Sequence, residues 1–195
     1  MHADYSVELG PDDDVLEIPW SSPDGSLRYY DLGLHPELIE KISEAVAHPP
    51  LKEFLVAINR DSIFRSAKCD VWFSEEVYPD EEIYGSCKFA SYVDLVVLEG
   101  PDKSADQRLS FVTHEGLLKK LVRLLKKTLE ILASAEFILR RCYFHGDRNT
   151  TDGFYMTLYV FGYGDEPRTA QQNWKAALQA VQGVLLALKP RDLVP

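Results

Sequence analysis

The sequence of 195 residues is poor in cysteine and has no long apolar run. Its three cysteines, Cys69, Cys87 and Cys142, are odd in number and form no CxxC pair. We therefore expect no zinc site built on thiolates, and we interpret all three as small buried residues in a reducing compartment. No apolar segment approaches the roughly 20 residues that a membrane-spanning helix needs, so no membrane partner is predicted.

Residues 1–14 lack the features of a secretory signal, because they have neither a basic start nor an apolar stretch. This absence favours a cytoplasmic location. The segment ends in Gly-Pro-Asp-Asp-Asp. That composition predicts a flexible acidic lead-in to the folded part of the chain.

Common catalytic and nucleotide-binding motifs are also missing. The chain has no Walker loop, no GxGxxG after a predicted strand, no HExxH and no nucleophile elbow. The acidic segment 74–82 lacks the glycine that an EF-hand needs, and we interpret it as a solvent-facing loop. We therefore predict no cofactor and no bound metal, and a non-enzymatic protein fits the sequence better than an enzyme does.

The residues that are present indicate a packed globular protein, with 46% hydrophobic and 27% charged residues. The net charge of −10 is unevenly distributed. Residues 1–100 carry 21 acidic and 7 basic side chains (net −14), whereas residues 101–195 carry 10 acidic and 14 basic side chains (net +4). The overall acidity argues against nucleic-acid binding, although the split allows a basic patch on one side of the molecule.

Periodicity and turn signals predict an alternation of strands and helices. Thr113 is the expected N-cap of one helix, and Thr169 with Gln172 matches a capping box at the start of the last one. The predicted strands cover residues 15–20, 27–32, 68–74, 89–99, 135–145 and 154–164, and the predicted helices cover residues 36–47, 50–58, 113–129 and 169–188.

These elements predict one α+β domain over residues 1–195, with an antiparallel or mixed sheet and helices mainly on one face. The most clearly organised part, residues 89–188, reads strand, helix, strand, strand, helix. That order is most of a ferredoxin-like arrangement without its final strand. Residues 68–74 or the N-terminal hairpin are the candidates for the missing edge, and two small sheets that share the helices are the alternative.

A basic stripe on the predicted helix over residues 113–129 is the first candidate surface. Its cations fall opposite a broad leucine face, at the spacing of an amphipathic helix. Such a stripe is usually solvated, but it also fits an acidic partner, either the acidic half of this chain or another subunit. The cations are Lys119, Lys120, Arg123, Lys126 and Lys127.

The Tyr- and Arg-rich hairpin over residues 135–164 is the second candidate. If residue 145 pairs with residue 154, Arg140 lies opposite Tyr159, and alternation places Tyr155 and Tyr163 on the same face. That face is suited to a flat or anionic ligand or to a dimer interface, unless Tyr and Arg simply cover each other. The candidate ligand-binding residues are Arg140, Arg141, Tyr143, His145, Asp147 and Tyr159.

Two weaker candidates complete the set. His145 with Asp147, and His114 with Glu115, supply histidines and carboxylates for a metal or acid–base site, but no third ligand is fixed by spacing. The basic segment 59–68 offers cations that either bind an anion or pair with neighbouring carboxylates.

The sequence thus favours a non-enzymatic binding or interaction domain that self-associates through a sheet face or edge. The alternative is a small enzyme or metal-binding protein with its site around His145 and Asp147.

Overall fold

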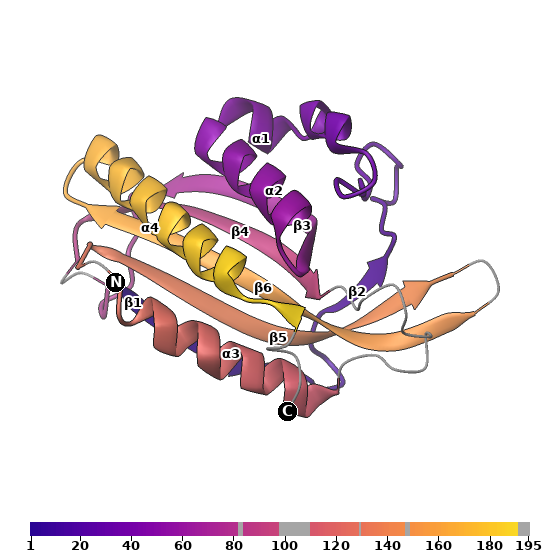
Figure 1. The fold of residues 1–195 in the computed structure, drawn as a ribbon. Helices are drawn as coiled ribbons and strands as arrows, with labels where there is room; N and C mark the ends of the chain where they lie inside the picture. Colours follow the sequence, from indigo (N-terminus) through magenta and orange to yellow (C-terminus); the bar gives the residue numbers. More distant parts are fainter. Residues whose placement is uncertain (82–83, 98–109, 129, 147–148, 191–195) are drawn as a thin grey trace.

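The computed structural model describes residues 1–81, 84–97, 110–128, 130–146 and 149–190. Strands and helices alternate along the chain (Figure 1). The strands are β1 (His2–Val7), β2 (Val15–Ile18), β3 (Phe64–Ser74), β4 (Cys87–Val97), β5 (Ala133–His145) and β6 (Thr150–Gly164). The helices are the 3₁₀ helix η1 (Pro36–Lys41), α1 (Ser43–Ala47), α2 (Pro49–Asp61), α3 (Phe111–Leu125) and α4 (Pro167–Ala187).

The six strands form one mixed sheet in the order β1-β5-β6-β4-β3, and β2 also pairs with β5. β1 and β2 run parallel to β5, whereas the β5–β6, β6–β4 and β4–β3 pairs are antiparallel. The predicted fold class is therefore confirmed. The order β5-β6-β4-β3 is consistent with a ferredoxin-like arrangement in which β3 takes the place of the missing edge strand.

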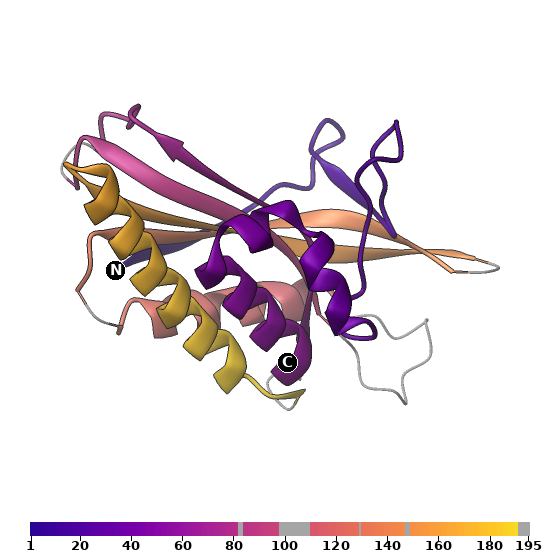
Figure 2. The ribbon, with the colours of Figure 1, turned by 90° about the horizontal axis from the view of Figure 1, so that it is seen from above.

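The helices pack on one face of this sheet, as Figure 2 shows from above. α4 lies along β6 and β4, and α3 lies against β1 and β5. Gly162 permits the close approach of α4 to β6, because a Cβ atom there would overlap the backbone of Trp174 and Ala170. The buried Trp174 indole donates to Ser91 Oγ on β4 at 2.9 Å, which fixes the helix across two strands. Within the described residues, no helix combines the length and the apolar composition needed to cross a membrane.

The N-terminal region differs from the prediction. Residues 2–7 of the expected flexible lead-in form β1, and Tyr5 reaches α3, where its hydroxyl donates to Glu115 at 3.3 Å. The predicted strand over residues 15–20 forms β2 beside β5. Its expected hairpin with residues 27–32 is reduced to a single bridge between Ser21 and Arg28, with backbone hydrogen bonds from Tyr29 to Trp20 and from Ser22 to Leu27, both 2.8 Å. The edge of β5 lies far away in sequence, so local turn signals could not indicate this pairing.

The first residues of α3 and α4 also differ from the prediction. Ser110, not Thr113, caps α3, and its side chain accepts a hydrogen bond from the Thr113 backbone at 3.4 Å. α4 begins at Pro167 after Glu166, without a side-chain cap, so the predicted capping box at Thr169 is wrong. Both helices therefore begin about one turn before the residue that was predicted as the cap. The exact ends are the least certain feature of a helix that is predicted from sequence.

Candidate functional site

The sheet has two chemically different faces. The face beneath the helices carries mainly apolar residues, such as Phe137, Leu158 and Val93. The opposite side, here called the open face, carries the alternate residues of the same strands, and most of these are aromatic, polar or charged. On β4 and β6 they are Lys88, Ala90, Tyr92, Asp94, Tyr155, Thr157, Tyr159, Phe161 and Tyr163.

One end of the open face forms a cleft of about 1020 Å³, here called the aromatic cleft. In Figure 2, the β3–β4 connection rises above the sheet at this end. The cleft is lined from β1, β3, β4, β5 and β6 and from that connection. Its lining residues are His2, Trp72, Ser74, Glu76, Val77, Tyr78, Asp80, Glu81, Tyr84, Lys88, Ser134, Glu136, Tyr159, Phe161 and Tyr163.

A row of aromatic rings forms the floor of the cleft. Tyr159, Phe161 and Tyr163 follow one another at every second position of β6, and their rings stack with centroids 6.0 and 6.3 Å apart. Trp72 on β3 meets Tyr159 and Phe161 edge-on at 6.4 and 6.3 Å. Tyr84 stacks on Tyr163 at 5.3 Å. The rings hold one another in place, so the floor is preformed.

Lys88 shows what kind of group this floor accepts. Its ammonium lies 4.6 Å from the ring centroid of Tyr78 and 5.4 Å from that of Phe161. It also forms an ion pair with Glu81 at 2.6 Å, in which the side chains are only 9% and 13% exposed. An ammonium held between aromatic rings and a carboxylate is the arrangement by which proteins bind organic cations.

Glu81 is held in its charged form by several donors. Burial works against its ionisation, but hydrogen bonds from Lys88, from the Tyr78 backbone and from Tyr163 outweigh that cost, so its pKa lies below the usual value. The Tyr163 hydroxyl donates to Glu81 at 2.8 Å and also contacts Ser134 Oγ at 3.1 Å. Burial raises the pKa of Tyr163, so this hydroxyl keeps its proton and remains a donor.

Glu136 carries negative charge without a matching cation. In the described part of the chain it has neither a hydrogen-bond donor nor an ion-pair partner. Burial and the charges of Glu81 and Asp4 raise its pKa, and His2 and Lys88 offset this only in part. Glu76, Asp80, Glu81 and Glu136 therefore face a single lysine in the cleft, which leaves a surplus of negative charge.

A polar network crosses the middle of the open face. Arg140 on β5 donates to Glu8 at 2.8 Å and to Thr157 Oγ1 at 3.0 Å. Thr157 in turn donates to Asp94 Oδ1 at 2.7 Å. Burial raises the pKa of Asp94 to about 6, although Thr157, Lys68 and Arg140 act in the opposite direction. Asp94 can therefore gain or lose a proton near neutral pH, but it is only 6% exposed.

The register of the β5–β6 hairpin corrects the prediction. His145 pairs with Thr150 rather than with residue 154, so Arg140 lies opposite Tyr155 and not opposite Tyr159. Thr150 and Thr151, which the sequence placed in the turn, are β-branched and form the first residues of β6. Because the shift is an even number of residues, every side chain keeps its face, and Arg140 shares the open face with the tyrosines as predicted.

The structure separates the six predicted ligand-binding residues. Arg140 and Tyr159 lie on the open face, whereas Arg141 and Tyr143 lie on the other side of β5, where they line a cavity with Ser110. His145 is exposed at the far end of the hairpin, where its ring contacts Glu17 and Thr150. Asp147 falls outside the described residues.

The structure also shows where the two predicted basic surfaces lie. α3 ends at Leu125, before the predicted end at residue 129, so it carries Lys119, Lys120 and Arg123 of the basic stripe, while Lys126 and Lys127 directly follow it. All of these cations are exposed except Lys120, which is half-buried, and Lys119 pairs with Glu115 at 2.9 Å. In the basic segment over residues 59–68, Arg60 pairs with Asp61 at 2.7 Å, whereas Lys68 lies 5.7 Å from the Trp20 ring.

His114, which the sequence paired with Glu115 as raw material for a metal or acid–base site, is 4% exposed. Its Nδ1 lies 3.1 Å from the carbonyl of Ser110. In the described ranges, no three His, Cys, Asp or Glu residues are grouped so that they could hold a metal ion.

The sequence analysis missed Trp72, Lys88, Glu81, Glu136 and Asp94. A signal was present in β4, where Lys88, Tyr92 and Asp94 interrupt an apolar strand at every second or fourth position. Such alternation in a central strand indicates that one face is not covered by apolar layers. Glu81 and Glu136 carry no comparable signal, because only the fold brings them together.

The chain matches no family model, and comparisons with curated proteins and with solved structures found no match either. The class of protein is therefore defined by its own geometry: an α+β protein with a one-sided sheet and an acidic aromatic cleft on the uncovered side.

Proposed function

We propose that this protein is a non-enzymatic binding domain whose aromatic cleft takes up lysine or arginine side chains from a basic segment of a partner protein. The observation that carries the proposal is the ammonium of Lys88, held between Tyr78, Phe161 and Glu81. The same chemistry continues beyond Lys88, since Trp72 and Glu136 line the cleft without such an occupant.

A protein segment suits the cleft better than a small ligand. Its volume of about 1020 Å³ lies at the upper end of the range of small-molecule pockets, roughly 300–1,000 Å³. Its carboxylates come from different elements, Glu76 and Asp80 from the β3–β4 connection and Glu136 from β5. Several cations on one flexible chain can meet this spread of charge together.

The test is calorimetric titration with a short peptide of alternating lysine and serine, capped at both ends. The intact protein is expected to bind it saturably, and to bind it more weakly as salt screens the charges. Replacing Glu136→Gln and Asp80→Asn together should weaken binding about fivefold, because each exposed charge pair contributes up to about 1 kcal/mol.

A matched control removes the same charge elsewhere. Glu37 on η1 and Glu53 on α2 are exposed and lie outside the cleft. The double variant Glu37→Gln/Glu53→Gln should bind as the intact protein does. Equal weakening by the control and the cleft variant would show nonspecific attraction and contradict the proposal. Equally strong binding of a capped control peptide of alternating glutamate and serine would also contradict it.

A second copy of this chain is a specific candidate for the basic partner. The exposed cations of α3 lie on the helix-covered side of the sheet, opposite the cleft. Self-association would then join the α3 face of one molecule, Lys119, Lys120, Arg123, Lys126 and Lys127, to the acidic cleft of the next. This contact gives the basic stripe the acidic partner that its composition favours.

We also infer a cytoplasmic location. It is supported by Cys69, Cys87 and Cys142, which form no disulfide in the structure.

A further inference from the structure

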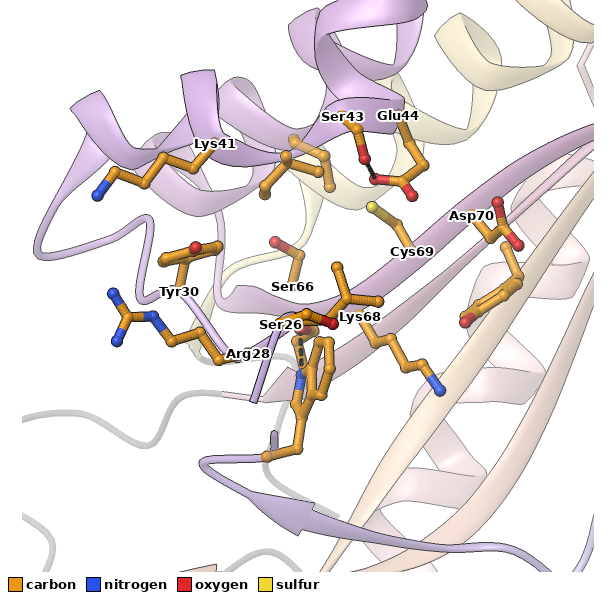
Figure 3. A pocket seen from close by; sticks show the side chains of 16 residues that line it. Ser26, Arg28, Tyr30, Lys41, Ser43, Glu44, Ser66, Lys68, Cys69 and Asp70 are labelled. Atoms are coloured by element: carbon orange, nitrogen blue, oxygen red, sulfur yellow. Dashed lines mark hydrogen bonds between the residues drawn. The ribbon is translucent and has the colours of Figure 1, made fainter. Parts of the chain in front are cut away.

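A second, smaller cavity lies at the opposite end of β3 from the aromatic cleft. It has a volume of about 320 Å³ and is enclosed by β3, the segment after β2, η1 and α1 (Figure 3). We call it the Trp20 cavity. Its size lies at the lower end of the range of small-molecule sites, roughly 300–1,000 Å³.

The walls of the Trp20 cavity are anchored. The Trp20 indole donates to the Ala67 carbonyl at 2.7 Å, and a break in the β3–β4 register at Ala67 leaves that carbonyl available. The segment after β2 is therefore tied to β3. Leu55, only 1% exposed, and Ile42 supply apolar surface from the helices.

The charges around the Trp20 cavity are polarised. In Figure 3, Arg28 and Lys41 reach the same end, on either side of Tyr30, while Glu44 and Asp70 lie toward the other end together with Lys68. In the described part of the chain, neither Arg28 nor Lys41 forms an ion pair with a carboxylate. Two unneutralised cations at one mouth are notable in a protein with a net charge of −10.

Ser66 supplies a buried donor inside the cavity. It is 6% exposed and points from β3 into the space beneath the helices (Figure 3). Its oxygen accepts a hydrogen bond from Asn59 Nδ2 at 2.7 Å. Its proton has no acceptor among the described residues, so this buried hydroxyl is left to bond to a ligand.

We propose that the Trp20 cavity binds a small organic carboxylate. The carboxylate lies between Arg28 and Lys41, and a compact apolar body extends along Ile42 and Leu55, with the Ser66 hydroxyl as a further donor. This site is separate from the aromatic cleft and has the opposite charge preference.

The test uses three probes that share a six-carbon body: hexanoate, hexylamine and hexanol. Each is titrated into the full chain while the backbone amide NMR signals of Ser66 and Cys69 are followed. Hexanoate should shift these signals saturably. The amine and the alcohol should bind at least about tenfold more weakly, because hydrogen bonds to a charged group are the stronger ones. Inorganic phosphate, an anion without an apolar chain, should also bind more weakly.

The variant Arg28→Gln/Lys41→Gln should weaken hexanoate binding about tenfold, and it keeps the fold because both side chains are exposed. The control Lys126→Gln/Lys127→Gln, just after α3, should leave binding unchanged, as should Glu136→Gln in the aromatic cleft. Absence of saturable shifts, equal shifts with hexylamine, or undiminished binding by the Arg28/Lys41 variant would overturn the proposal.

Discussion

Asp94 is a single carboxylate at the centre of a strand that is otherwise mostly apolar. Its open-face position in β4 places it between Thr157 on β6 and Lys68 on β3. Burial raises its pKa to about 6, even though Thr157, Lys68 and Arg140 favour the charged form, and Asp14 acts with burial. The charged form of Asp94 at neutral pH therefore lowers the stability of the folded protein.

The pH dependence of stability follows from this shift. In the unfolded chain Asp94 titrates near 3.8, so between pH 4 and 6 the folded state holds its proton more tightly than the unfolded state does. The contribution of Asp94 to stability is then greatest below pH 4 and is lost as the pH rises through about 6.

Asp94→Asn removes the titration while keeping an oxygen that can accept from Thr157. The variant should raise the free energy of unfolding at pH 8 by on the order of 2–3 kcal/mol, since each pKa unit corresponds to about 1.4 kcal/mol. At pH 4 the two proteins should differ much less. Thermal unfolding at both pH values measures this, and an equal effect at both would rule out a shifted carboxyl.

At the scale of single residues, the sequence predicted part of the aromatic cleft. Alternation along β6 was enough to place Tyr155, Tyr159 and Tyr163 on one face, because the period of a strand does not depend on its partner. Arg140 of β5 shares that face because the error in the predicted register was an even number of residues. The pairing partner of each residue did depend on where the turn closes, and there the sequence analysis was wrong. Lys88 and Glu81 meet only through the fold.

At the scale of elements, the contact between α4 and β6 depends on the absence of a side chain at Gly162. A methyl group there would overlap the backbone of Trp174, which cannot move without shifting the whole helix. The buried Trp174–Ser91 hydrogen bond would be strained at the same time. The helix and the sheet are therefore matched at one position of closest approach.

Gly162→Ala should lower the free energy of unfolding by about 1–3 kcal/mol or more, the usual cost of overpacking a core. Gly183 in α4 is the control, because nothing lies within 4 Å of a Cβ atom added there. Gly183→Ala should stabilise the protein by up to about 1 kcal/mol through helix propensity. Urea denaturation of both variants tests the pair, and equal effects of the same sign would contradict this account of the packing.

At the scale of the whole molecule, the uneven charge of the sequence becomes two separated surfaces. The cleft carries the carboxylates Glu76, Asp80, Glu81 and Glu136 on the open side, and α3 carries the basic stripe on the helix-covered side. A contact between these two different surfaces of two copies is head-to-tail and does not close on itself at two molecules.

If the copies associate in this way, light scattering at low salt should give a mass above that of the monomer, and high salt should reduce it. Charge reversal at the C-terminal end of the basic stripe (Lys126→Glu/Lys127→Glu) or in the cleft (Asp80→Lys/Glu136→Lys) should each give a monomer. Because the two reversed surfaces also complement each other, a mixture of these two variants should regain a mass above that of the monomer. A monomer mass for the intact protein at low salt would remove self-association and leave the basic-segment proposal standing.

The sequence by itself determined the fold class, the faces of the long strands and the helices around them. These features repeat with the periods of helix and strand, which follow from local backbone geometry. It did not determine β1, whose residues were assigned to a flexible lead-in, or the partner of β2, because both strands are held by pairing with the distant β5. Only the tertiary structure brought Lys88, Glu81 and Glu136 together, because contacts between residues far apart in the chain have no period in the sequence.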